Sequence, residues 1–131
     1  MKKLLLALAA SALAGGAGAA SVTPLYAHDL PDVAGKEGAM LTVVLAPGEI
    51  SPVHRHNADV FVYVLSGAVI MQVKGGEGVT LHAGQTFYEA PSDIHVVGSN
   101  ASRTRPAKFI AFFVEEKGAP PVVAVPDGAA Q

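Results

Sequence analysis

Short hydrophobic runs separated by Gly, Pro and Asn make up most of the chain from Ala39 onward. No long window shows a helical period, whereas runs of about four to eight residues rich in Val, Ile, Phe and Tyr are typical of β-strands. Turn signals such as Pro47-Gly48 and Gly75-Gly76 stand between the runs. The pattern predicts an all-β domain with strands at residues 40–46, 60–65, 68–73, 79–82, 86–89, 95–97 and 108–115.

Two of the predicted strands are hydrophobic on both faces. Residues 60–65 and 109–114 lack the strict alternation of polar and apolar positions that a half-exposed strand shows. One face can fill the interior of a barrel, but the other needs a second sheet or a second subunit to cover it. For a chain this small, we therefore expect a homodimer.

The N-terminus has the pattern of a secretory signal peptide. Lys2 and Lys3 precede an apolar run over residues 4–14, and small residues follow up to an A-x-A-like cleavage site at residues 17–19. The apolar run is too short to span a bilayer. We therefore expect removal of residues 1–20, no stable membrane insertion afterwards, and a periplasmic or secreted mature protein. The alternative is an uncleaved anchor close to the membrane.

The remaining chain, about 110 residues, has the length of one domain. We divide it into an N-terminal arm or strand at 21–39, a β-barrel at 40–117 and an extended Pro/Ala-rich tail at 118–131. Loss of Lys2 and Lys3 would change the formal charge from −2 to about −4, and a chain of this charge without a basic cluster is not expected to bind nucleic acid. The sequence contains no cysteine, so no disulfide supports the fold.

Two histidines separated by one residue indicate a metal site. His54 and His56 point the same way in an extended segment, because side chains alternate between the faces of a strand. Both imidazoles could then bind one ion, and His95 from a neighbouring strand would complete the set. Three neutral imidazoles leave open positions on an octahedral ion, and imidazole suits Fe, Ni, Cu or Zn. The alternative for His54 and His56 is a pair of surface or hydrogen-bonded histidines.

The segment around the first two histidines resembles the first motif of the cupin family. Four residues match that motif in type and spacing: Gly48, His54, His56 and Gly67. Val60 stands where the family has Glu. The missing carboxylate removes a negative charge, so the predicted site is more cationic, a weaker trap for hard Mn²⁺ and a stronger Lewis acid toward an anionic ligand.

The second cupin motif is recognisable around His95. Gly84 and His95 have the separation that the family shows, whereas Asn100 lies one residue beyond its expected place. The resemblance, over about residues 48–100, is to a small single-domain cupin of type 2 in the RmlC-like superfamily, here exported. It implies a double-stranded β-helix, or jelly-roll barrel, of two facing antiparallel sheets. It also implies that the three histidines hold the metal.

Three further residues are candidates for an auxiliary ligand. Asp59 is odd-numbered, so in an extended strand its side chain points to the face opposite to that of His56 and Val60. It reaches the site only if a bulge re-aims it; otherwise it caps the strand or faces solvent. Gln72 is either an inward amide or an exposed polar residue of its strand. Glu89 is a candidate general base only if it faces inward.

Two functions fit this sequence. The first is a metal-dependent enzyme that binds a small anionic or enol-forming molecule in the barrel mouth, with dioxygenase-type chemistry permitted by the resemblance. No catalytic acid or base can be named from the residues. The second is a non-catalytic module of the cell envelope that binds a small ligand or a metal in an apolar pocket. The fold does not decide between them, because one barrel hosts many functions.

Overall fold

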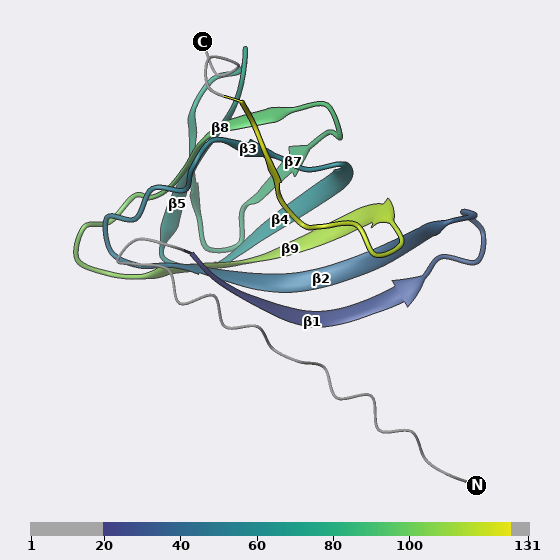
Figure 1. The fold of residues 1–131 in the computed structure, drawn as a ribbon. Helices are drawn as coiled ribbons and strands as arrows, with labels where there is room; N and C mark the ends of the chain where they lie inside the picture. The colour runs from purple at the N-terminus through teal and green to yellow at the C-terminus, as the bar shows by residue number, and fades with distance from the viewer. Residues whose placement is uncertain (1–19, 127–131) are drawn as a thin grey trace, which may run out of the picture.

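Two antiparallel five-stranded sheets form the protein, as a computed structural model of residues 20–126 shows (Figure 1). The first sheet has the order β1-β2-β9-β4-β7, and its strands are β1 (Ser21–Asp29), β2 (Lys36–Leu45), β9 (Ala107–Glu116), β4 (Ala58–Ser66) and β7 (Thr86–Glu89). The second has the order β10-β3-β8-β5-β6, and its strands are β10 (Val123–Ala124), β3 (His54–Arg55), β8 (Ile94–Asn100), β5 (Ala68–Val73) and β6 (Val79–His82).

This architecture confirms the predicted all-β, double-stranded β-helix fold. The predicted strands at 68–73, 79–82 and 86–89 coincide with β5, β6 and β7, and those at 60–65, 95–97 and 108–115 lie within longer ones. The strand predicted at 40–46 extends one residue beyond the end of β2 at Leu45. Strands β1, β3 and β10 complete the two sheets. The predicted signal peptide lies outside the described residues except for Ala20. Within residues 20–126, no helix is long and apolar enough to cross a membrane.

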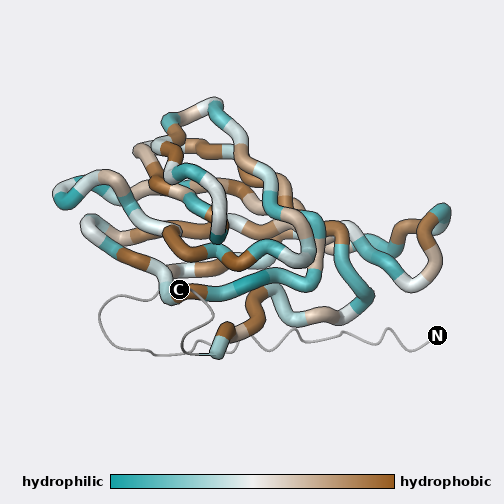
Figure 2. The backbone as a smooth tube through the Cα atoms, turned by 90° about the horizontal axis from the view of Figure 1, so that it is seen from above, coloured by the Kyte–Doolittle hydropathy of each residue, from teal (hydrophilic) through white to brown (hydrophobic). Residues whose placement is uncertain are grey.

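The core lies between the inward faces of the two sheets. Val60, Val62 and Val64 of β4 are all buried, with exposed fractions of 1%, 3% and 0%, as their shared parity predicts. On β9 the inward residues Phe109 and Phe113 alternate with half-buried ones. Brown, hydrophobic stretches accordingly run along the strands in Figure 2. Each fully buried side chain of this size contributes about 1.5–3 kcal/mol to folding.

The outer face of β4, β7 and β9 also carries large apolar side chains. Phe61, Tyr63 and Tyr88 are about half exposed, and the ring centroids of Phe61 and Tyr88 are 5.2 Å apart. These side chains, with Ile110 and Phe112, line a groove of about 430 Å³. The second apolar face expected from the sequence is therefore present in this sheet. The homodimer expected to cover it stays a prediction.

The reversal between β4 and β5 depends on a glycine of the first motif. Gly67 has a φ of 73°, in the left-handed region that glycine adopts without steric cost. A Cβ at this position would lie 2.7 Å from the carbonyl oxygen of Pro106. Any side chain at Gly67 would therefore displace the segment that enters β9.

The C-terminal tail is not only extended but joins the second sheet. In β10, Val123 pairs with Arg55 and Ala124 pairs with His54. The tail thus lies along the segment that carries two of the candidate metal ligands (Figure 1).

Candidate metal centre

The first two histidines lie where the chain crosses from the second sheet to the first. His54 belongs to the two-residue strand β3, and His56 follows just before β4. The loop that precedes them is held against β8, because Ser51 N–H donates to the carbonyl of Gly98 at 2.7 Å. The even-numbered residues of this segment keep one orientation, so His56, Ala58 and Val60 are all buried.

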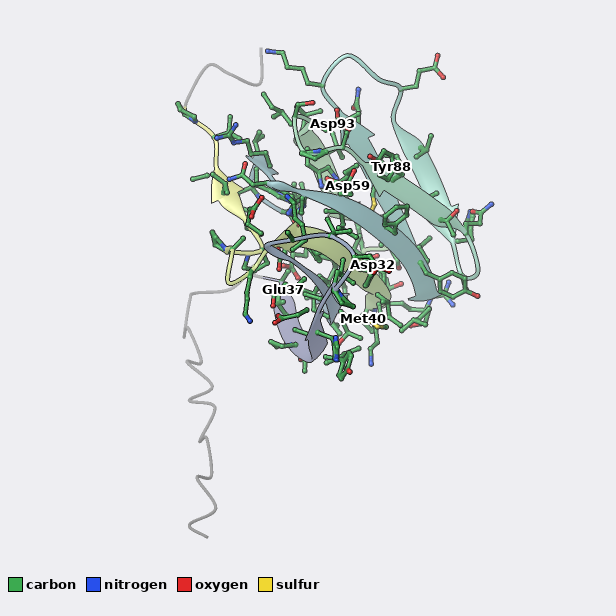
Figure 3. The ribbon with its side chains drawn as sticks, turned by 90° about the vertical axis from the view of Figure 1, so that its right-hand side faces the viewer. Asp32, Glu37, Met40, Asp59, Tyr88 and Asp93 are labelled. Atoms are coloured by element: carbon green, nitrogen blue, oxygen red, sulfur yellow. The ribbon has the colours of Figure 1, made fainter. Side chains whose placement is uncertain are left out.

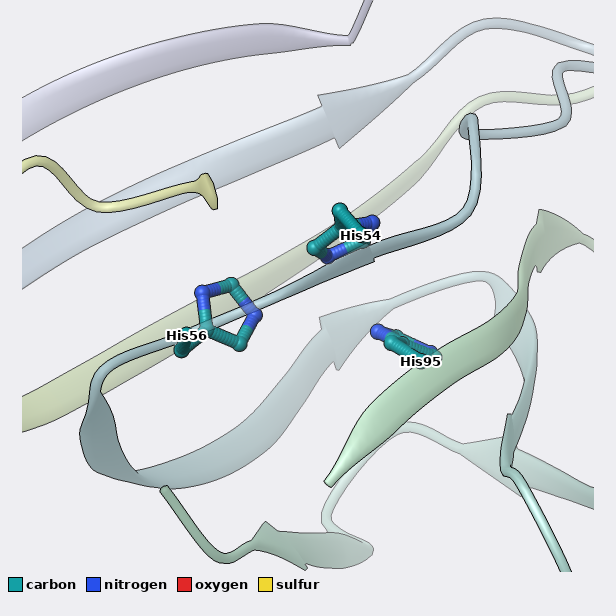
Figure 4. Close-up of side chains that lie close together, drawn as sticks. All are labelled: His54, His56 and His95. Carbon is teal, nitrogen blue, oxygen red and sulfur yellow. The ribbon is translucent and has the colours of Figure 1, made fainter. Parts of the chain in front are cut away.

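His95 enters the same space from β8. It is the cross-strand partner of His54, and the ring centroids of these two imidazoles are 4.9 Å apart. The rings of His54 and His56 are also 4.9 Å apart. One nitrogen from each of the three imidazoles lies within 4.8 Å of the other two, as expected for ligands of one ion (Figure 4).

A β-bulge sets the direction of His95. Val73 of β5 pairs with His95, whereas Gln72 pairs with Val97, so Val96 is an extra residue in β8. Bulges of this kind re-aim side chains. As a result, His95 and Gly98 both line the interior although they are three residues apart. Gly98 also makes room for the ring, since a Cβ there would lie 3.2 Å from Cε1 of His95.

Backbone carbonyls fix the orientation of two imidazoles. Nδ1 of His54 lies 2.8 Å from the carbonyl oxygen of Pro52, and Nδ1 of His56 bonds to the carbonyl oxygen of Pro121 in the tail. A carbonyl only accepts, so both Nδ1 atoms carry the proton. The Nε2 lone pairs remain free to bind a metal, in the arrangement by which metal-binding histidines are usually held.

Burial keeps two of the imidazoles neutral. It lowers the pKa of His95 to about 4; the neighbouring His54 and His56 add to the effect, and the backbone of Val97 opposes it. Burial also lowers the pKa of His56; the bond to Pro121 opposes this shift, and His54 adds to it. Metal binding requires deprotonated imidazole, so these two side chains are in the correct state at neutral pH.

Glu89 is the one auxiliary candidate that the structure brings to the histidines. Its side chain faces inward at the end of β7, and the residue is 2% exposed. Its Oε2 lies 3.5 Å from Nε2 of His56 and 3.4 Å from Nδ1 of His95. Burial, with a smaller contribution from the charge of Asp93, raises the pKa of Glu89 to about 7.

The other two auxiliary candidates point away from the cluster. Asp59 lies on the outer side of β4, where its carboxylate accepts a hydrogen bond of 2.6 Å from the hydroxyl of Tyr88 (Figure 3). Gln72 is turned toward the 74–77 turn and donates to the carbonyl of Gly76 at 2.9 Å. No bulge re-aims Asp59 among the β4 pairings around it, so neither side chain reaches the histidines.

The site opens into a large cavity between the sheets. The cavity has a volume of about 760 Å³, and its polar side chains include the three histidines and Glu89. Most of the remaining lining is apolar, as Leu41, Val62, Met71, Phe109 and Phe113 illustrate. A cavity of this size can enclose a small organic molecule and exclude water from one end of it.

Unpaired polar atoms test whether these residues fit a metal ion. Both ring nitrogens of His95 and Oε2 of Glu89 are buried without a hydrogen-bond partner among residues 20–126. Buried polar groups are normally satisfied, and an unsatisfied one costs about 1–3 kcal/mol. An ion among the histidines would satisfy one ring nitrogen of His95 and Oε2 of Glu89, so the donor set fits a divalent metal.

A three-histidine cluster inside a jelly-roll barrel is typical of cupin metal sites. A sequence profile of the cupin domain family matches residues 41–113, which is more than half of the chain. The chain therefore belongs to the cupin domain family. None of the curated proteins matches it.

Several solved structures share the fold. An oxalate oxidase in complex with the substrate analogue glycolate is 24% identical, with a TM-score of 0.65 over 84% of this chain and 57% of that one. A DMSP lyase from Ruegeria pomeroyi DSS-3 is 21% identical, with a TM-score of 0.60 over 70% and 45%. The cupin domain of an XRE family transcriptional regulator from Enterobacter cloacae is 28% identical, with a TM-score of 0.55 over 72% and 94%. The chain thus spans about half the length of the first two proteins.

Proposed function

We propose that this cupin binds one divalent metal ion through His54, His56 and His95. The observation that carries the proposal is the convergence of three imidazoles whose ligand atoms lie within 4.8 Å of one another. Two of the rings are oriented by carbonyls, and the third is buried without a hydrogen-bond partner in the described chain. Imidazole ligands favour Fe, Ni, Cu or Zn.

We further propose that the cavity binds a small anionic or enol-forming molecule. A bound divalent ion would act as a Lewis acid toward such a ligand and, if it is iron, would support dioxygenase-type chemistry. The chain itself supplies an apolar chamber that encloses the body of the ligand, and a polar end at the histidines that orients it. Glycolate, which an oxalate oxidase of this fold binds as a substrate analogue, is a small carboxylate, so we would screen this class first.

The second candidate is a non-catalytic binding module of the cell envelope. The largely apolar lining of the cavity favours it, whereas the inward carboxylate of Glu89 beside the histidines favours the enzyme. Enzymes that move protons usually place an acid or base beside the ion. Turnover of any screened carboxylate or enol by the metal-loaded protein would decide against this candidate.

Elemental analysis of the protein, purified without a chelator or histidine tag, tests the metal site. We expect near-stoichiometric Fe, Ni, Cu or Zn, and loss of that metal in His95→Ala and in the double variant His54→Ala/His56→Ala. The double variant should keep most of its fold, because the buried strands supply the stability. Absence of metal from the wild type even after reconstitution would contradict the proposal, and complete unfolding of the double variant would indicate a structural site.

The same preparation tests export. We propose that the mature protein is periplasmic or secreted, on the basis of the charged, apolar and small-residue segments at the N-terminus. Mass spectrometry of protein from the periplasm should show a chain that starts at Ala20 or Ser21. A chain that retains residues 1–19 in a membrane fraction would support the uncleaved anchor instead.

A further inference from the structure

We infer that Glu89 is a fourth ligand of the ion held by the three histidines, and that it replaces the carboxylate which the first cupin motif places at position 60. This inference rests on the proposed metal site. It assigns to β7 a ligand that the motif assigns to β4.

Strand register places Glu89 beside the position of the missing carboxylate. Val60 and Glu89 are direct partners across the antiparallel pair β4 and β7. Both residues face the interior, with exposed fractions of 1% and 2%. Directly opposite residues have Cβ atoms about 4.5–5.5 Å apart, so the longer side chain of Glu89 can bring a carboxylate into the space that a Glu at position 60 would occupy.

The distances fit ligands of one ion better than hydrogen bonds. Oε2 of Glu89 is 3.4 Å from His95 Nδ1 and 3.5 Å from His56 Nε2, both longer than the usual N–H···O range of about 2.7–3.2 Å. Two ligands at about 2.1 Å from a tetrahedral ion are themselves roughly 3.4 Å apart. The carboxylate oxygen is therefore spaced from these two imidazoles as a neighbouring ligand would be, although the ligand atoms that all lie within 4.8 Å of one another are those of the three histidines alone.

The carboxylate has no other evident purpose in this position. Oε2 of Glu89 is buried and lacks a hydrogen-bond partner within the described part of the chain. By contrast, the nearby Asp59 is engaged by the Tyr88 hydroxyl on the outer face. A buried carboxylate oxygen without a donor is costly, and a cation at the histidines would offset that cost.

This assignment changes the expected preference of the site. Three imidazoles alone leave the full charge of a divalent ion uncompensated, whereas Glu89 restores the negative charge that Val60 removes. Hard cations such as Mn²⁺ depend on oxygen ligands more than Zn²⁺ does. The site should therefore bind both Mn²⁺ and Zn²⁺. Glu89 should contribute more to the affinity for Mn²⁺ than to the affinity for Zn²⁺.

Metal titration of four proteins tests the inference. The dissociation constants for Zn²⁺ and Mn²⁺ are measured by competition with a chromophoric chelator, for the wild type, Glu89→Val, the exchange variant Val60→Glu/Glu89→Val and the control Asp59→Asn. We expect Glu89→Val to weaken Zn²⁺ binding at least about 10-fold and Mn²⁺ binding further. The exchange variant should recover most of the loss, because it returns the carboxylate to the partner position. Asp59→Asn should bind as the wild type does.

The melting temperatures of the metal-free proteins show whether Glu89 is a metal ligand or a residue that stabilises the fold. If Glu89 is held for metal binding, Glu89→Val without metal should melt at the same or a higher temperature than the wild type, since it removes an unpaired buried carboxylate. If Glu89→Val fails to fold, Glu89→Gln, which has the same shape without the charge, is measured in its place.

Two outcomes would overturn the inference, and they are distinguishable. Equal affinities of the wild type and Glu89→Val for both ions would show that the three-histidine site binds metal without Glu89. Absence of metal binding by the wild type would instead remove the proposed function, and the fourth ligand with it.

The electron paramagnetic resonance spectrum of bound Mn²⁺ gives a second readout, since loss of a carboxylate ligand should change it in Glu89→Val but not in Asp59→Asn.

Discussion

At the scale of single residues, His95 and Asn100 illustrate two uses of a buried polar side chain. Both lie on β8 and both are buried. His95 has no hydrogen-bond partner for either ring nitrogen in the region 20–126, whereas the Asn100 amide donates to the carbonyls of Leu45, Ala46 and Arg105. The first side chain is available for a ligand, and the second connects the end of β2 to the loop that precedes β9.

Asn100→Ala should therefore destabilise the fold without removing the metal ligands. The substitution leaves three carbonyls without their donor and Ser102 N–H without its acceptor. We expect a loss of about 2–4 kcal/mol in the free energy of unfolding, measured by urea denaturation. Asn57→Ala, at an exposed bend, serves as the control. A change below about 0.5 kcal/mol in Asn100→Ala would contradict this role.

At the scale of strands, the sequence predicts most of the fold. It predicts little of the short strands, bulges and strand pairings that orient the side chains of the site. Longer hydrophobic runs mark β4, β5 and β9, and glycines mark their ends. The strand β1 is exposed along its whole length, so it has no burial pattern, and β3 and β10 have only two residues each. These short strands are formed by pairing with distant segments, which local propensity does not contain.

The candidate site is likewise predicted only in part from the sequence. The spacing of His54, His56 and His95 predicts their convergence, because parity and strand proximity are enough. The bulge at Val96 depends on the register between β5 and β8, which no local pattern shows. Glu89 could have been placed inward from its alternation with Tyr88 and its parity with Phe87, but two adjacent aromatic residues hide which face is buried. Its pairing with Val60 is a property of the sheet.

Removal of the tail that contains β10 should weaken metal binding. A chain shortened after Ala119 loses the Pro121 carbonyl that orients His56 and the pairing of Ala124 with His54. Loss of such a supporting hydrogen bond typically weakens metal binding 10–100-fold, and we expect a decrease of about this size. The free energy of unfolding should change little, because β10 contributes two residues to the sheet.

A chain shortened after Pro126 is the matched control, since it keeps β10 and the Pro121 carbonyl. Metal titration and urea denaturation of both shortened chains are compared with those of the full chain. If the chain that ends at Ala119 binds metal as tightly as the full chain, the tail does not support His56 in solution.

At the scale of the whole molecule, one sheet is apolar on both sides. Its inner face fills the core, and its outer face presents the groove lined by Phe61, Tyr63, Tyr88, Ile110 and Phe112. Aromatic side chains that are half exposed and close together are common in the centres of protein interfaces. A second copy of the chain, packed on the same face about a twofold axis, would cover both grooves at once.

We therefore predict that Phe61→Asp weakens a homodimer. A charge at the centre of the groove should raise the dimer dissociation constant roughly 30-fold, which corresponds to about 2 kcal/mol. Size-exclusion chromatography with light scattering over a concentration series measures the change. Leu25→Asp, an equally exposed position on β1, should leave the dimer intact. A monomeric wild type, or a dimer that is unaffected by Phe61→Asp, would show that this face is not the interface.

The pairing of Val60 with Glu89 also bears on how such sites are recognised and how they evolve. Two substitutions on neighbouring strands are enough to move an acidic group from one segment of the gene to another while it keeps its place in the barrel. A search that demands Glu at a fixed point of the first motif would count this chain among cupins that have lost their acidic ligand. A search that scores positions joined by strand pairing would retain it.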